Sequence, residues 1–230
     1  MIPWLDTRDP FPPVERALRE PNGLLAAGGD LSPERLVDAY RHGIFPWFGE
    51  DDPLLWWSPD PRMVLFLREL RVSRSLRRTM KSGQFSVTVD HAFLQVMAGC
   101  AEPRADAAGT WITDDMVEAY GELADRGIAH SIETWNNGHL VGGLYGVALG
   151  RMFYGESMFS RRTDASKVAL VVLTRQLERW GFEMIDCQMS TGHLASLGAR
   201  EVPRAEFLER MRRLALQPAI PGPWTLDGDL

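Results

Sequence analysis

The first third of the chain predicts one amphipathic helix followed by an irregular, aromatic segment. Ser32 precedes Pro33, a pair typical of a helix N-terminus, and apolar residues recur at helical spacing up to Tyr40. Residues 43–62 then combine four prolines with many aromatic side chains. Because proline interrupts both helices and sheets, we expect no regular structure there. We infer a soft domain boundary near residues 58–60.

The middle of the chain alternates predicted strands and helices. Residues 62–66 form an apolar run, and residues 85–89 alternate as a half-buried strand does. Between them, residues 73–82 predict a basic helix. Asp90 is expected to cap a further helix, and Thr113 another, with acidic residues in its first turn. We therefore expect two strands flanked by three helices.

The second half of the chain predicts an antiparallel meander and then a crossover. Residues 136–138 (Asn-Asn-Gly) separate two strand-like runs, as a tight hairpin turn would. A third strand follows, and Glu156 closes its apolar, aromatic run. A helix over 164–180 and a strand over 182–187 then predict a parallel crossover. Two short helices are expected at the end, near residues 193–197 and 203–216.

This order of elements predicts an α+β fold. A meander followed by a loop, a helix and a parallel strand is the core of acetyltransferase-like (GNAT) folds. We expect a mixed sheet of this GNAT-like kind over residues 61–230, as a catalytic domain. A small N-terminal domain, residues 1–60, would precede it. A likeness at the level of fold leaves the substrate open.

Composition narrows the class of protein. The chain of 230 residues is 45% hydrophobic and 24% charged, which is ordinary for a soluble globular protein. Its two cysteines form no close-spaced motif and its histidines lie in no metal-binding spacing, so neither disulfides nor a metal site is indicated. The first residues do not resemble a signal peptide, and no uncharged apolar run is long enough to span a bilayer. We expect a cytoplasmic protein without a membrane segment.

Charge is distributed unevenly along the chain. The net charge is −6, yet residues 60–81 carry seven basic and only two acidic side chains. Screening limits the reach of distant charges to about 10 Å, so such a stretch can bind phosphates even on an acidic protein. The alternative is a solvated helix face, which composition alone favours.

Three polar residues are candidates for a chemical centre. Asp186 and Gln188 are two apart on a predicted strand and therefore share a face. If the crossover pairs this strand with the end of the meander, Glu156 lies at the neighbouring strand end. All three would then converge at the carboxyl edge of the sheet, where open α/β sheets bind ligands. The alternative is three unrelated, solvated side chains. A buried charge at Glu156 would require a cation to meet it.

Apolar and aromatic residues around this centre suggest a ligand pocket. An apolar pocket with a few convergent polar groups is the usual small-ligand site, and the alternative is plain core packing. The candidate pocket residues are Phe153, Met158, Leu170, Leu177 and Ile185. Tryptophans in predicted loops would stack on nucleobases or pack between domains, and these are Trp47, Trp56, Trp57 and Trp111.

Many motifs in one order resemble the bacterial leucyl/phenylalanyl-tRNA–protein transferases. They extend from about Arg19 to Phe207 and are REPNGLLAAGGDLSPERLVDAYRHGIFPWF, LLWWSPDPR, TWIT, SIETW, LVGGLYG, FYGESMFS, IDCQ and HLASLGAR. The resemblance implies transfer of Leu or Phe, and Met more weakly, from aminoacyl-tRNA to proteins with N-terminal Arg or Lys, marking them for degradation. Aminoacyl-tRNA would be the co-substrate, and no cofactor is implied.

The resemblance also assigns residues to roles. The polar, catalytic centre would be Glu156, Asp186 and Gln188. The amino acid would bind against Leu144, Phe153, Met158, Ser160, Leu170, Leu177 and Ile185, with the terminal adenosine near Trp47 and Trp111. Charge distribution, not the resemblance, makes the basic stretch our candidate for the phosphates of tRNA, namely Arg62, Arg74, Arg77, Arg78 and Lys81.

A mechanism follows as a hypothesis. Glu156 would pair with the cation of the protein substrate. Asp186 would accept a hydrogen bond from the side-chain amide of Gln188, whose carbonyl would orient the attacking amine. Proximity and orientation would then supply most of the acceleration.

Three other functions remain open at this stage. An acyl-CoA N-acyltransferase would be expected to carry a glycine-rich pyrophosphate loop, and residues 157–167 contain no glycine. A tRNA-dependent aminoacyltransferase of cell-wall synthesis would be expected to contain two GNAT-like units, and this chain has room for one. An RNA-binding module would leave the carboxylates of Glu156 and Asp186 unexplained, because they repel phosphate.

Overall fold

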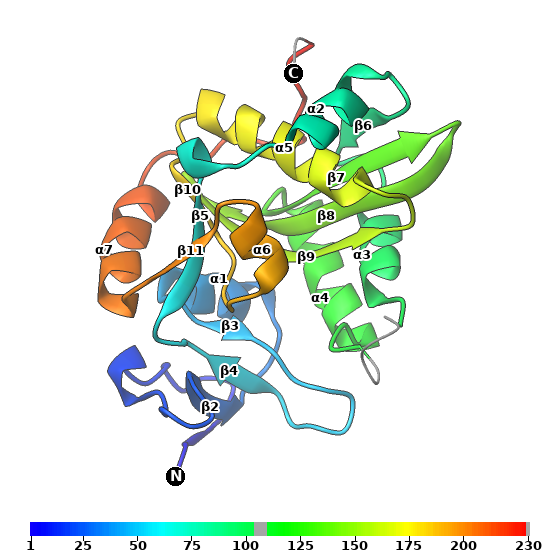
Figure 1. Ribbon diagram of the computed structural model, residues 1–230. Coiled ribbons are helices and arrows are strands. Elements are labelled where there is room, and N and C mark those ends of the chain that lie inside the picture. Colours follow the sequence, from blue (N-terminus) through cyan, green and yellow to red (C-terminus); the bar gives the residue numbers. More distant parts are fainter. Residues whose placement is uncertain (104–109, 229–230) are drawn as a thin grey trace.

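A computed structural model describes residues 1–103 and 110–228, and its strands form two sheets (Figure 1). Four short strands from the first 57 residues make one sheet, in the order β1-β2-β4-β3. Seven strands make the other, in the order β11-β5-β10-β9-β8-β7-β6. Within the described residues, no helix is long and apolar enough to cross a membrane.

The N-terminal sheet contains the segment for which the sequence predicted no regular structure. Its strands are β1 (Trp4–Leu5), β2 (Leu24–Gly28), β3 (Phe45–Pro46) and β4 (Leu55–Trp57). The prediction was wrong because both strands are short enough to avoid disruption by proline. Pro46 is the last residue of β3, and β4 contains no proline. Trp56 and Trp57 on β4 are buried, so they pack rather than stack on a ligand. The Trp56 indole donates to the Gly28 carbonyl at 2.8 Å.

The predicted meander and crossover are confirmed in the larger sheet. The strands β7 (Ala129–Asn136), β8 (His139–Leu149) and β9 (Met152–Ser160) pair antiparallel in turn. The chain then crosses through α5 (Ala165–Arg179) to β10 (Met184–Asp186), which pairs parallel with β9. The fold is therefore α+β and GNAT-like.

The remaining strands extend this sheet on both sides. The predicted strands are β5 (Arg62–Phe66), antiparallel to β10, and β6 (Ser86–Val89), antiparallel to β7. The sequence missed β11 (Arg200–Val202), whose three residues carry too little apolar pattern to be recognised.

The helices cover both faces of the seven-stranded sheet. In Figure 1, α5 and α2 (Arg74–Lys81) lie over one face, while α3 (Phe93–Ala101) and α4 (Asp114–Asp125) lie over the other. The other helical elements are η1 (Val14–Arg16), α1 (Pro33–Arg41), η2 (Leu67–Glu69), α6 (Gly192–Ser196) and α7 (Arg204–Ala215).

Two of the three predicted helix caps are confirmed. Ser32 accepts from the backbone of the first turn of α1, and Thr113 does so for α4. Asp90 does not cap α3, which begins after Ala92. Its carboxylate instead accepts from the backbone N–H groups of Ser131 and Trp224, so it ties β7 to the C-terminal segment.

The hydrophobic core does not stop at the predicted boundary near residue 60. One cluster of buried residues runs from the N-terminal sheet and α1 to α3, α4 and one face of the larger sheet. A second cluster lies between α5 and the other face. The strands before residue 60 form one sheet and those after it form the other. The division of the chain into two domains at residue 60 stays a prediction.

A buried ion pair joins β5 to β10. The Arg62 guanidinium donates two parallel hydrogen bonds to the Asp186 carboxylate, at 2.8 and 2.7 Å, and both side chains are fully buried. A third bond reaches the Gly43 carbonyl at 3.2 Å. The guanidinium also lies 4.7 Å from the ring centres of both Phe45 and Phe207.

This pair corrects the sequence-based role of Arg62. A guanidinium without solvent exposure cannot meet a tRNA phosphate. The side chain is buried because a carboxylate inside a sheet requires a charged partner, and Arg matches a carboxylate with two bonds. The partner lies 124 residues away along the chain, beyond the reach of sequence periodicity.

Breaking this pair on one side should destabilise the protein more than removing it entirely. Arg62→Met leaves Asp186 charged and buried, so we expect a loss of about 3–5 kcal/mol in the free energy of unfolding. Adding Asp186→Leu removes that lone charge, and the double variant should be more stable than Arg62→Met. Urea unfolding measures both. The exposed Arg68→Met is the control, with an expected loss below about 1 kcal/mol. Additive losses from the two substitutions would contradict this account.

Candidate active site

A bulge in β9 brings Glu156 to the centre of the sheet. On β8, Tyr145 pairs with Ser157 and the next residue, Gly146, pairs with Gly155, so Glu156 is an extra residue in β9. Bulges re-aim a side chain and bend the strand, and they often lie beside active sites. The sequence placed Glu156 at a strand end. That was wrong, because β9 continues to Ser160.

The strands β9 and β10 separate next to this bulge. They pair only through Phe153 with Ile185 and Tyr154 with Asp186, after which β10 ends. A cavity of about 900 Å³ lies at this point. Of the nine residues predicted to bind substrate, eight line the cavity: Trp47, Trp111, Leu144, Phe153, Met158, Ser160, Leu170 and Ile185.

Leu177 does not line the cavity. It is fully buried in the core between α5 and the sheet. Leu177 is two helical turns beyond Leu170, or about 10 Å along α5, and the cavity does not extend that far. Leu173, which the sequence analysis missed, does line it. Because it is three residues from Leu170 and so shares its face of the helix, helical spacing could have identified it.

Gln188 is held in position by its own backbone. It adopts a left-handed conformation, with φ of 54°, and its N–H donates to the Asp186 carboxylate at 2.9 Å. Its carbonyl accepts from the N–H of Met63 on β5 at 3.2 Å. A left-handed residue other than glycine is uncommon and needs such support.

The side-chain amide of Gln188 has a different partner from the one expected. It donates to Glu156 at 3.2 Å, not to Asp186. Both Asp186 oxygens already accept from Arg62, and one of them accepts the Gln188 N–H as well. Asp186 is fully buried and does not line the cavity, so it acts on Gln188 through the backbone.

Two tyrosines complete the surroundings of Glu156. The hydroxyl of Tyr120 on α4 donates to the Glu156 carboxyl at 3.3 Å, and it also hydrogen-bonds the hydroxyl of Tyr40 on α1. Helical spacing marked Tyr40 only as an apolar helix position, and Tyr120 was not identified as a site residue. A buried tyrosine usually needs a partner for its hydroxyl, and this was the available signal.

Burial raises the pKa of Glu156 to about 8, and the nearby charge of Asp186 adds to this effect. Hydrogen bonds from Tyr40 and Tyr120 act in the opposite direction but do not offset burial. The group is therefore mostly protonated at neutral pH in the free protein. A cation entering the cavity would lower this pKa and favour the carboxylate.

The cavity has an apolar side and a polar side. Leu144 and Tyr145 are neighbours on β8 and face opposite ways: Leu144 belongs to the core under α5, and Tyr145 to the core against α3 and α4. Leu170 and Leu173 therefore line the side with Leu144. Glu156 and Tyr120 meet on the other side.

The two predicted adenosine contacts, Trp47 and Trp111, both line the cavity. Trp47 is 38% exposed and packs against Trp57, with ring centres 5.4 Å apart. Ser160 has a local role, since its hydroxyl donates to the Arg162 carbonyl and accepts from Ser166 at the start of α5.

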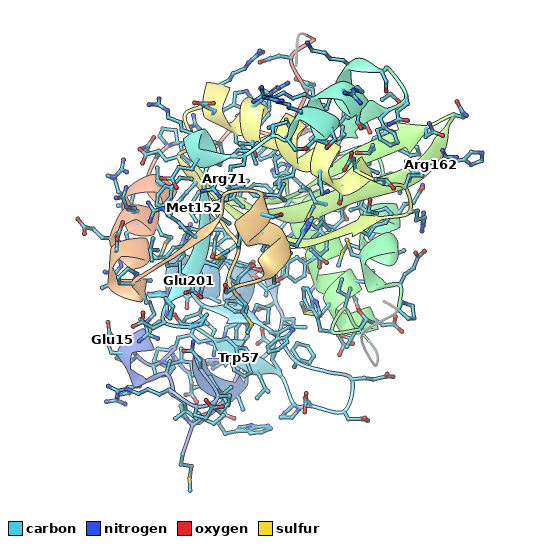
Figure 2. The ribbon with its side chains drawn as sticks, viewed as in Figure 1. Glu15, Trp57, Arg71, Met152, Arg162 and Glu201 are labelled. Atoms are coloured by element: carbon cyan, nitrogen blue, oxygen red, sulfur yellow. The ribbon has the colours of Figure 1, made fainter. Side chains whose placement is uncertain are left out.

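The other predicted tRNA contacts lie on α2. Its basic side chains are exposed: Arg74, Arg77, Arg78 and Lys81. Through Leu76, α2 packs on Val168 and Val171 of α5. The basic helix thus lies beside the helix that forms one wall of the cavity. Arg162, in the connection from β9 to α5, extends into solvent (Figure 2).

Two solved structures share part of this arrangement. L-PGS from Bacillus licheniformis has a TM-score of 0.41 at 13% identity, covering 75% of this chain and 57% of that one. An aminoglycoside acetyltransferase from an uncultured soil metagenomic sample has a TM-score of 0.38 at 13% identity, covering 64% and 99%.

Sequence comparison is far more specific. The leucyl/phenylalanyl-tRNA protein transferase family profile matches residues 64–212, and the profile of its N-terminal domain matches residues 29–60. The transferase of Thiobacillus denitrificans is 66% identical, covering 94% of this chain and 95% of the relative. That of Nitrosomonas europaea is 61% identical, covering 99% and 96%. The chain is therefore an enzyme of the leucyl/phenylalanyl-tRNA–protein transferase family, an aminoacyltransferase that uses aminoacyl-tRNA and a protein as substrates.

Proposed function

We propose that this enzyme transfers Leu or Phe, and Met more weakly, to the α-amino group of proteins that begin with Arg or Lys. The modified proteins would be marked for degradation through their new N-terminus, in the cytoplasm. The observation that carries the proposal is one cavity with an apolar side and, across the bulged strand, the half-buried carboxyl group of Glu156.

The apolar side accounts for the amino acid. Leu144, Phe153, Leu170 and Ile185 present hydrocarbon to the cavity. Such a pocket rejects small or charged side chains but separates similar apolar shapes by only about 1–3 kcal/mol per methylene-sized difference. Acceptance of Leu, Phe and Met by one pocket follows.

The polar side accounts for the protein substrate. Glu156 is costly to ionise where it lies, as its raised pKa records. The side-chain cation of an N-terminal Arg or Lys would offset that cost with a charge-assisted pair. A neutral N-terminal side chain would leave Glu156 protonated and gain nothing from it.

The chemistry needs orientation more than acid–base catalysis. The amine nitrogen attacks the ester carbonyl carbon, an amide bond forms, and the bond to the ribose oxygen of the tRNA breaks. The proton lost by the amine ends on that oxygen. With its amide nitrogen donating to Glu156, the Gln188 carbonyl is free to accept from the attacking amine. An α-amine with a pKa of about 7.7–8.0 is already partly unprotonated, and the ester is activated, so no cofactor is required.

Transfer should depend on the first residue of the acceptor. With tRNA carrying labelled Leu or Phe, we expect label on peptides that begin with Arg or Lys, and none on a matched peptide that begins with Ala. The physical reason is the carboxyl group of Glu156, because Glu102, which also lines the cavity, is already paired with Arg161. Equal labelling of the Ala peptide, or consumption of acetyl-CoA in place of aminoacyl-tRNA, would contradict the proposal.

Glu156 should make stability depend on pH. Its carboxyl is protonated in both states below an unfolded pKa near 4.5, and only the folded state holds its proton up to about 8. The wild type therefore loses stability relative to Glu156→Gln as pH rises from 4.5 through 8, on the order of 5 kcal/mol in all. Urea unfolding of both proteins at pH 5 and pH 9 measures this difference. If the two proteins differ in free energy of unfolding by the same amount at both pH values, the pKa of Glu156 in the folded protein is not raised.

The basic helix α2 should contribute to tRNA affinity through phosphates. Binding should fall steeply with salt, and the slope should become shallower in Arg77→Ala plus Arg78→Ala, because fewer counterions are released. Exposed arginines elsewhere provide a control pair, Arg16→Ala plus Arg212→Ala, which should keep the wild-type slope. Fluorescence titration of labelled tRNA over a range of salt concentrations gives the slopes. If the α2 variant also keeps the wild-type slope, α2 is a solvated face and nothing more.

A further inference from the structure

The hydroxyl group of Tyr145 stands apart from those of the other tyrosines. The chain has four, and all are fully buried. Tyr40 and Tyr120 hydrogen-bond each other, and Tyr154 donates to the Tyr40 carbonyl at 2.9 Å. Within residues 1–103 and 110–228, the Tyr145 hydroxyl has no hydrogen-bond partner. Buried polar groups in native proteins are rarely left unpaired, so this one calls for an explanation.

Tyr145 lines the cavity and is held rigidly. Its ring packs edge-on against Phe93 and Tyr120, each with centres 5.8 Å apart. Across the sheet it pairs with Ser157, the residue after Glu156. Burial raises the pKa of Tyr145 well above its usual value, and the charge of Glu156 raises it further, so the hydroxyl stays neutral.

The position of this hydroxyl selects the kind of group that it would bind. It lies on the same side of the sheet as Tyr120, which holds Glu156, and on the opposite side from Leu144 and the apolar pocket. A cation beside this hydroxyl would also favour the ionised form of Glu156. Its N–H groups need acceptors beyond the two oxygens of one carboxylate.

We propose that the Tyr145 hydroxyl accepts a hydrogen bond from the side-chain cation of the N-terminal Arg or Lys, and so forms, with Glu156, the site for that side chain. This assignment rests on the proposed function. Tyr145 is then a specificity-determining residue whose hydroxyl is paired only when the protein substrate is bound.

The test is Tyr145→Phe, assayed with saturating aminoacyl-tRNA. We expect KM for the Arg and Lys peptides to rise about 10- to 100-fold, as for a lost hydrogen bond to a charged group. The value of kcat and the KM for aminoacyl-tRNA should stay near those of the wild type. Because the hydroxyl has no partner among the residues that the structure describes, thermal stability should not fall. Tyr154→Phe is the matched control, since it loses its bond to the Tyr40 carbonyl and should melt at a lower temperature.

Each other outcome has a definite meaning. An unchanged KM for the peptides, or a raised KM for aminoacyl-tRNA alone, would overturn the assignment of Tyr145. So would a thermal midpoint that falls as far as that of Tyr154→Phe, because the hydroxyl would then have a structural partner. If the wild type does not distinguish the Arg and Lys peptides from the Ala peptide, the proposed function fails first, and the assignment of Tyr145 fails with it.

Discussion

The buried pair of Arg62 and Asp186 is the constraint on which the site depends. It fastens β5 to β10 and reaches the turn after α1 through the Gly43 carbonyl. The same carboxylate accepts the backbone N–H of Gln188 and stabilises its left-handed conformation. Charges so deeply buried are tolerated only with full pairing, which leaves the carboxylate one fixed orientation. The backbone of Gln188 is thereby held in a fixed position beside the cavity.

The cavity arises from two departures from regular pairing in neighbouring strands. The bulge in β9 turns Glu156 out of the normal alternation, and β10 ends where the bulge begins. As a result, residues from both faces of the sheet line the cavity. The cavity therefore has an apolar wall under α5 and, on the other side of the strand, a carboxyl group that accepts from Tyr120 and Gln188.

Much of the fold was accessible to sequence reasoning because it is local. The caps at Ser32 and Thr113, the hairpin at residues 136–138 and the helix α5 each follow from short-range rules, and the structure confirms them. The misses have physical reasons as well. The strands β3, β4 and β11 are too short for periodicity. The Asp90 carboxylate does not cap α3 because it accepts from the backbone N–H groups of Ser131 and Trp224, which are distant in the sequence.

The sequence by itself determined the class of fold and the family, and it identified ten of the residues that line the cavity, because these depend on local periodicity and on motifs in a fixed order. Only the tertiary structure decided what each charged or polar group meets. Arg62 lies in a basic stretch yet pairs with a carboxylate 124 residues away. Leu177 has the right spacing but lies beyond the cavity. Tyr145 is one buried tyrosine among four until its hydroxyl is seen to have no partner within the described part of the chain. Pairing and burial depend on contacts between distant segments, and no local pattern records them.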